Sequence, residues 1–265
     1  MKAAVLMYHA IPQRRKDLEN ADPHYAVEAE VFRCHLQRAA VRGLTVRSVR
    51  DWRAATPDKL QGAVALTFDD GHESNFFHAF PLLQAQGATA DFFVNPSVVG
   101  SKGFVTWAAL REMADHGMSI QSHGYTHRYF DELSRDEVRR ELYESKAMLE
   151  DRLGRPVSLF APPGGRITPV VMNLAWELGY EAVCTSRPGC WDGRRGDREI
   201  PRLAVRAATA APVVEDWMAG RAAAVAVQAA RYRLARWAKQ ALGNRRYDAL
   251  RSSLLRFARR PGTTG

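Results

Sequence analysis

The sequence predicts an α/β protein, a distorted (β/α) barrel followed by an appended C-terminal helical segment. Up to about residue 206, short apolar runs alternate with stretches of helical periodicity, which is typical of parallel βαβ units. Roughly seven or eight such repeats are too many for a small doubly wound sheet and favour a barrel. We therefore expect a barrel over residues 1–211 and a basic, Ala- and Arg-rich helical segment over residues 212–265.

The expected strands are the short apolar runs. In chain order they are Ala3–Tyr8, Thr45–Val49, Val64–Phe68, Thr89–Val94, Ser119–Ser122, Ser158–Ala161, Ala182–Thr185 and Leu203–Val205. In such barrels the functional groups gather where strands end and loops begin, so the residues that follow these runs are the first candidates for a site.

The expected helices lie between the strands and carry recognisable end signals. They are Glu28–Arg42, Asn75–Gln86, Trp107–His116, Arg135–Leu153 and Pro169–Leu178. Several are followed by a glycine suited to the left-handed position after a helix, namely Gly43, Gly87, Gly117, Gly154 and Gly179. Ser134 and Glu137 have the spacing of a capping box at the start of the fourth helix.

Charge is concentrated in the C-terminal segment. The formal charge is +9, and Val213–Gly265 holds eleven basic and three acidic residues, against 27 and 26 in the rest of the chain. Leu234 and Trp237 begin an apolar stripe, continued by Ala241 and Leu242, beside an arginine-rich face. Such a segment can contact an anionic membrane surface, or it can pack on the barrel with a solvated basic face. It has no motif that reads nucleic acid, so no nucleic-acid partner is expected.

Cysteine usage and the N-terminal residues indicate a location. Cys34, Cys184 and Cys190 are an odd number without CxxC spacing, which fits a reducing compartment. The N-terminal stretch lacks an extended basic region and a small-residue cleavage site, and no apolar run reaches the length of a transmembrane helix. We expect a cytoplasmic protein, with peripheral contact at the inner face of a membrane as an option for the basic helices.

Candidate ligands and acid–base groups follow the expected strands in four places. These are His9, the pair Asp69-Asp70 in "TFDDG", His123 and His127 in "SHGYTH", and Pro163 with Gly164 in "FAPPGG". Two imidazoles and one carboxylate make a three-ligand metal site that leaves positions open, and a second carboxylate nearby can act as general base. Singly, each motif also fits a cap, a core histidine or a plain turn. Their conjunction at strand ends predicts a metal-dependent hydrolytic site.

The motifs TFDDG, SHGYTH and FAPPGG, in this order and at these separations, resemble motifs one to three of the polysaccharide deacetylase family (NodB homology, carbohydrate esterase family 4) over roughly residues 1–206. The resemblance implies a distorted (β/α) barrel that removes acetyl groups from amino sugars with a divalent metal, Zn²⁺ first and Co²⁺, Ni²⁺ or Mn²⁺ as alternatives. It implies that Asp70, His123 and His127 bind the metal, that Asp69 is the base for the attacking water, and that the Gly164 N–H stabilises the oxyanion.

Two positions depart from the family pattern. Ala161 stands where many members have an arginine that pairs with the base, so Arg166 or Arg202 is expected to supply that charge from elsewhere. No histidine follows His127, so the family's late general acid is missing. The opening "VLMYHAI" resembles the biofilm-exopolysaccharide branch of the family, which implies that His9 takes that role.

The resulting hypothesis is a glycan deacetylase acting on an N-acetylated sugar of a polysaccharide, an oligosaccharide or a lipid-linked glycan, with another small acyl group as an open option. Trp191 is expected to line an apolar pocket for the acetyl group, and Tyr25 lies on a loop that could border the sugar groove. The alternative is a catalytically silent carbohydrate-binding protein on the same fold, prompted by Ala161 and the missing late histidine.

Overall fold

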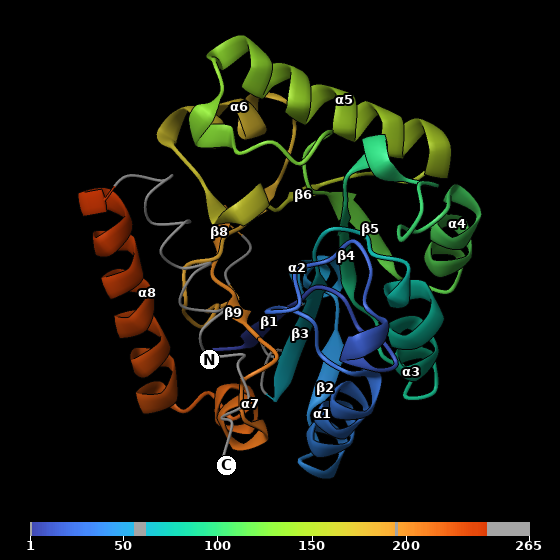
Figure 1. Ribbon diagram of the computed structural model, residues 1–265, viewed down its shortest axis with the longest axis vertical. Coiled ribbons are helices and arrows are strands. Elements are labelled where there is room, and N and C mark those ends of the chain that lie inside the picture. Colours follow the sequence, from blue (N-terminus) through green and yellow to red (C-terminus); the bar gives the residue numbers. More distant parts are fainter. Residues whose placement is uncertain (1, 56–61, 194–195, 243–265) are drawn as a thin grey trace, which may run out of the picture.

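The computed structural model describes residues 2–55, 62–193 and 196–242 (Figure 1). Within these residues the chain forms a curved nine-stranded sheet of order β8-β7-β6-β5-β4-β3-β1-β9, with β2 added beside β3 and the paired strands parallel. The strands are β1 (Ala4–Tyr8), β2 (Thr45–Arg47), β3 (Ala63–Phe68), β4 (Asp91–Val94), β5 (Ser119–Ser122), β6 (Leu159–Phe160), β7 (Ala182–Cys184), β8 (Glu199–Ile200) and β9 (Leu203–Ala204).

Helices surround this sheet in Figure 1. They are α1 (Ala29–Val41), α2 (Val49–Ala54), α3 (Phe80–Gln84), α4 (Trp107–Asp115), α5 (Arg135–Leu153), α6 (Pro169–Glu177), α7 (Ala211–Met218) and α8 (Ala222–Leu242). The five glycines predicted to end helices all have positive φ, and Ser134 and Glu137 form the predicted capping box. Among the described helices, none has the length and apolar character that crossing a membrane requires.

The segment of β8 and β9 brings the two edges of the sheet together. β8 pairs with β7, β9 pairs with β1, and only Pro201 and Arg202 separate these two strands in the chain. Proline has no N–H to donate to a neighbouring strand, so a change of partner at this point costs no ladder hydrogen bond. The sheet is thus curved into a distorted barrel, which confirms the predicted fold class.

Side chains of each strand alternate between two packed layers. On β1, Leu6 and Tyr8 join the outer cluster between sheet and helices, whereas Val5, and Ala3 just before the strand, join the inner cluster inside the barrel. Helix α2 was not predicted from the sequence. The strand expected over Thr45–Val49 ends at Arg47, because the Ser48 hydroxyl accepts the Asp51 N–H (3.0 Å) and caps α2.

Helix α7 belongs to the core of the barrel, although the sequence placed residues from 212 onward in an appended segment. Val214 and Trp217 are buried in the outer cluster, and Glu215 forms ion pairs with Arg38 and Arg42 of helix α1 and the residue after it. Of the predicted segment, the described residues therefore place α7 in the core and α8 at its margin. The break expected near Gly243-Asn244 lies outside the described residues.

Asp91, the first residue of β4, is a fully buried carboxyl group that contacts the start of α2. Its Oδ2 accepts the Val49 N–H (2.5 Å), and burial raises its pKa to about 7 although the hydrogen bonds that it accepts oppose this. A carboxyl group with a raised pKa binds its proton more tightly in the folded state. Its contribution to stability is therefore complete below the unfolded pKa and is lost as the pH rises through about 7.

We predict that Asp91→Asn, which keeps an acceptor oxygen without the charge, removes this pH dependence. Between pH values of about 4 and 8, the free energy of unfolding of the natural protein should fall relative to that of the variant by roughly 3–4 kcal/mol. Urea unfolding at both ends of this range measures the difference, with exposed Asp151→Asn as control. A difference that does not change with pH would contradict the prediction.

Candidate active site

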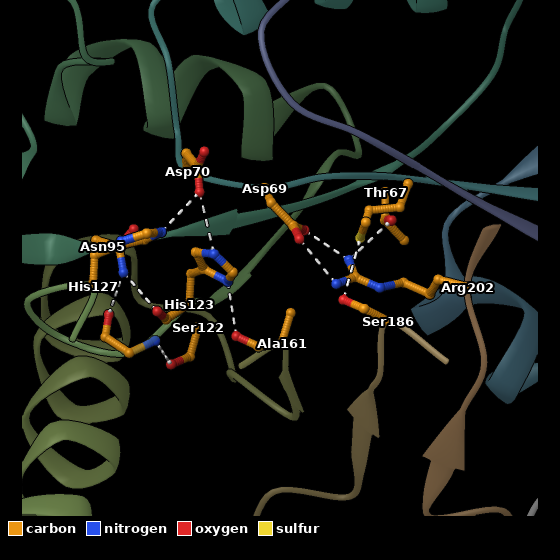
Figure 2. A network of polar contacts seen from close by, with 12 residues as sticks. Thr67, Asp69, Asp70, Asn95, Ser122, His123, His127, Ala161, Ser186 and Arg202 are labelled. Carbon is orange, nitrogen blue, oxygen red and sulfur yellow. Dashed lines mark hydrogen bonds and ion pairs between the residues drawn. The ribbon is translucent and has the colours of Figure 1, made fainter. Parts of the chain in front are cut away.

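The two adjacent aspartates follow β3 and have different surroundings. Asp69 continues the strand, since its N–H donates to the Tyr8 carbonyl (2.9 Å), and it is 3% exposed. Asp70 adopts a left-handed backbone conformation (φ 75°), which an aspartate tolerates better than most residues, and Gly71 follows in the same region (φ 67°). This turn directs the two carboxylates towards different partners (Figure 2).

Asp70 lies between the two histidines of the second motif. Its Oδ1 is 3.2 Å from Nε2 of His123 and 3.2 Å from Nε2 of His127. Ligand atoms of the three residues all lie within 4.8 Å of one another, which is compact enough to hold a metal ion. The histidines hold the pKa of Asp70 well below its usual value, although burial acts in the opposite direction. The structure therefore brings together the three predicted ligands.

The hydrogen bonds of His123 show that this group suits a cation. Its N–H continues from β5 to the Val94 carbonyl (3.0 Å), and its Nδ1 lies 2.7 Å from the Ala161 carbonyl oxygen. A carbonyl oxygen only accepts, so Nδ1 carries the proton, and in the neutral ring Nε2 presents a lone pair. That lone pair faces the Asp70 carboxylate, and two acceptors at 3.2 Å need a proton or a cation between them.

The loop that carries His127 is held by a residue that sequence reasoning missed. Oε2 of Glu141 accepts the N–H groups of Tyr125 and Thr126 (2.8 Å each), and the Thr126 hydroxyl donates to the same carboxylate. Glu141 is 6% exposed, and His127 has a left-handed backbone conformation (φ 63°) that the loop must sustain. The sequence signal that could have identified Glu141 was the presence of a glutamate on the buried face of helix α5.

Asn95 holds the same loop from the other side. Its Nδ2 donates to the carbonyl oxygens of His123 (2.6 Å) and Gly124 (3.1 Å), and its side chain is buried. Asn95 directly follows β4, so its position after a strand was a signal in the sequence. The loop between the two histidines is thus held by Asn95, which follows β4, and by Glu141 on helix α5.

Arg202 forms a two-pronged ion pair with Asp69 inside the barrel. Its NH1 and NH2 atoms lie 2.6 and 2.9 Å from the two carboxylate oxygens, and Nε donates to the Thr185 carbonyl (3.2 Å) (Figure 2). Arg202 is 0% exposed. Burial raises the pKa of Asp69, but the charges of Arg202 and of the nearby histidines outweigh it and lower that pKa. Asp69 is therefore kept ionised.

Arg166, the other arginine considered as a partner of Asp69, has acidic contacts of its own. Its guanidinium is 2.6 Å from Glu132 and 3.5 Å from Asp131, and it stacks on the Tyr129 ring at 3.6 Å. It thus packs against the loop before helix α5, while Arg202 occupies both oxygens of Asp69.

His9 follows β1, at the same edge of the sheet as the aspartates. Tyr8 of β1 is paired with Phe68 of β3, so His9 and Asp69 follow neighbouring strands at the same level, and His9 is among the groups that lower the pKa of both aspartates. The ring stacks on Tyr25 (centroids 4.5 Å apart), and Asn75 donates to the His9 carbonyl (2.7 Å). Within the described part of the chain, Nδ1 of His9 is buried without a hydrogen-bond partner.

The turn of the third motif forms the 3₁₀ turn η6 (Pro163–Gly165). The N–H groups of Gly165 and Arg166 donate within the turn, to the carbonyls of Pro162 (2.9 Å) and Pro163 (3.3 Å). Gly164 has φ 62°, and a Cβ at this position would lie 2.8 Å from the Tyr129 ring. Gly164 is therefore required by both backbone conformation and space.

Trp191 does not line the site, contrary to the sequence prediction. It is 1% exposed, pairs with Ala3 before β1 (2.7 and 2.9 Å), and packs in the inner cluster. Ala3 and His9 are separated by the whole of β1, about 20 Å at roughly 3.3 Å per residue. The indole N–H donates to Asp197 (2.9 Å), so this tryptophan fills the opposite end of the barrel.

This parallel barrel brings two histidines, an adjacent carboxylate and a second buried carboxylate to one edge, which are the groups that metal-assisted hydrolysis requires. Residues 56–183 match the family model described as "Polysaccharide deacetylase". This match spans just under half of the chain, and the chain resembles this family over that region.

Known proteins resemble this chain over most of the barrel. A Bacillus subtilis protein named "Putative polysaccharide deacetylase YxkH" is 27% identical over 207 residues, 77% of this chain and 71% of that protein. A peptidoglycan-N-acetylglucosamine deacetylase of Bacillus cereus is 29% identical over 136 residues, 51% of this chain and 60% of that protein. The Streptococcus pyogenes deacetylase PplD, solved in complex with acetate, has a TM-score of 0.73 and 27% identity, covering 82% of this chain and 98% of that chain.

We predict that Glu141→Ala weakens metal binding at the Asp70–His123–His127 group. The substitution leaves two N–H groups and one hydroxyl of the loop without their acceptor, so His127 should lose its position. We expect the Kd for Zn²⁺ to rise about tenfold to hundredfold, measured by competition with a chromophoric chelator. Glu141→Gln should be intermediate, and exposed Asp151→Ala on the same helix serves as control. An unchanged Kd in Glu141→Ala would contradict this role.

Proposed function

We propose that the protein is a metal-dependent deacetylase that removes an N-acetyl group from an amino sugar. The observation that carries the proposal is the buried Asp69 carboxylate, kept ionised by Arg202 beside the group of Asp70, His123 and His127. A carboxylate of this kind, next to three metal ligands but not among them, is suited to act as a general base. Similarity to the polysaccharide deacetylase family supports deacetylation as the reaction.

Asp70, His123 and His127 would hold the metal, and their two nitrogens and one carboxylate suit Zn²⁺. When bound, such a cation polarises a carbonyl oxygen and lowers the pKa of a water molecule. Asp69 accepts the proton of the attacking water, and Arg202 fixes the orientation of the carboxylate by occupying both its oxygens from behind. The Gly164 N–H is our candidate donor to the oxyanion, beside Pro163, which has no N–H of its own.

His9 is our candidate for the acid that protonates the leaving amine. It follows β1, beside both aspartates, and stacking on Tyr25 orients its ring. A general acid is required because an amine leaves poorly without a proton. His9 supplies this function from the start of the chain, where the usual family pattern has a late histidine.

The substrate that we propose carries an N-acetylhexosamine. The relative from Bacillus cereus is named for N-acetylglucosamine in peptidoglycan, and the structure of the Streptococcus pyogenes relative contains acetate, the acid that deacetylation releases. We further propose that the enzyme works on the cytoplasmic side of a membrane, on an oligosaccharide or a lipid-linked glycan. The support for this location is helix α8, which has four basic residues and exposed apolar side chains.

We predict that the Zn²⁺-loaded protein deacetylates an N-acetylglucosamine oligosaccharide, measured as acetate released. Asp69→Asn should lower kcat by about a hundredfold to ten-thousandfold while the Kd for Zn²⁺ changes little, because the general base is lost and the three ligands remain. Full metal occupancy without turnover across a panel of acetylated glycans would instead support a silent carbohydrate-binding protein.

We also predict that His9→Ala retains Zn²⁺ but loses most turnover, by about a hundredfold or more in kcat. A substrate whose leaving amine is replaced by a good leaving group should recover much of this loss, because it no longer needs the proton. His24→Ala, on the same loop as Tyr25, is the control for disturbance of the loop. A near-normal rate in His9→Ala would show that another group is the acid.

A further inference from the structure

Helix α8 lies at the margin of the fold and follows α7 (Figure 1), and one of its sides packs on the outer cluster near its start. Gln228 is 6% exposed on this inner side, and Ala224 and Val225 pack against the outer cluster. The Trp217 indole N–H donates to the Ala224 carbonyl (3.3 Å), which ties α8 to α7. The described part of α8 therefore has a defined inner side and a defined outer side.

The outer side of α8 is an exposed apolar stripe. Val227, Leu234 and Trp237 are 53%, 67% and 68% exposed, among the most exposed large apolar side chains in the described chain. Together with Ala223 and Ala230 they follow one another at alternating intervals of four and three residues. At 100° per residue this spacing places them in one line along the helix. A helix that packs on its own barrel normally presents polar side chains to water, whereas this stripe presents apolar ones.

Basic residues border this stripe. Arg231 and Arg233 are both exposed and lie on opposite flanks of the line formed by Leu234 and Val227. The sequence of α8, Ala222–Leu242, contains four basic residues and no acidic one. An apolar line between positive flanks complements a surface that is apolar below and negatively charged above.

The charge pattern distinguishes between possible occupants of this stripe. A second copy of α8 would bring arginines against arginines at both flanks, which opposes a coiled-coil contact. A nucleic acid would neutralise the arginines but would leave Leu234 and Trp237 in water. A bilayer with anionic lipids satisfies both features, because it takes apolar side chains at the boundary of the acyl region and arginines at the lipid phosphates.

We propose that α8 docks in the plane of an anionic membrane surface, with Val227, Leu234 and Trp237 entering the lipid and Arg231 and Arg233 contacting the headgroups. This inference rests on the membrane location in the proposed function and does not depend on the deacetylase reaction. It assigns the contact to one side of one helix.

The test is co-sedimentation of the full chain with vesicles of phosphatidylcholine and phosphatidylglycerol, compared with phosphatidylcholine alone. We expect binding to the anionic vesicles only, accompanied by a blue shift of tryptophan emission that is absent in Trp237→Ala. The double variant Leu234→Glu/Trp237→Glu should bind at least about tenfold more weakly, and Arg231→Ala and Arg233→Ala about fivefold each. Tyr143→Glu, at a 60% exposed aromatic residue of helix α5, is the matched control and should bind normally.

Several results would overturn the proposal. These are equal binding by the double variant, no preference for anionic vesicles, or a dimer in solution that the double variant dissociates. Protection of Trp237 from iodide quenching in the free protein, without vesicle binding, would show that another part of the chain covers the stripe. Turnover of a soluble oligosaccharide should be normal in the α8 variants. Vesicle binding without turnover in the natural protein would count against the deacetylase function alone.

Discussion

The buried ion pair between Asp69 and Arg202 is the interaction on which the site depends. It joins the end of β3 to the segment between β8 and β9, where the sheet changes partner and the barrel closes. Isolated buried charges are unfavourable, but this pair is bidentate, and Arg202 also donates to Thr67 and Thr185. The same contact therefore closes the barrel and keeps one carboxylate ionised at the edge where the metal ligands meet.

The second constraint is conformational. Asp70 and His127 both occupy the left-handed region of backbone space, where a side chain carries a cost of about 1–2 kcal/mol relative to ordinary conformations. Such positions persist only when their surroundings hold them. Glu141 and Asn95 do so for the His127 loop, and Gly71 allows the chain to turn after Asp70. The geometry of the candidate ligands is thus set by groups outside the Asp70–His123–His127 group.

Residues immediately after strands could be predicted from the sequence, because parallel strands end at one edge. This holds for the fold class, for the convergence of Asp70, His123 and His127, and for the position of His9 beside them. The choice between Arg166 and Arg202 could not be made, since it depends on the closure of the barrel between β7 and β1. Trp191 was misplaced for a similar reason. Its two-residue pairing with Ala3 leaves no periodic signal in the sequence.

Helix α2 and the packing of helix α7 were also not predicted from the sequence, because tertiary contacts determine them. Val49 was expected to end the strand that begins at Thr45, but the Ser48 cap and the Asp91 carboxylate start a helix there. The Ala- and Arg-rich composition after Pro212 suggested one appended unit. Its first helix is fixed to the barrel by Val214, Trp217 and Met218, which composition cannot distinguish from the exposed stripe of α8.

The charges around the site explain why two adjacent aspartates suit this chemistry. With neutral histidines, Asp69, Asp70 and Arg202 carry a net charge of −1, so the site attracts a divalent cation. A bound divalent cation would change this sum to +1, which would favour the negative charge that develops on a carbonyl oxygen under attack by water. Because Arg202 keeps Asp69 ionised, this carboxylate is free of a proton when the attacking water has one to give. The two aspartates therefore have different roles in the proposed site. Loss of Asp70 would weaken binding of the cation, whereas loss of Asp69 would remove the group that accepts the proton of the attacking water.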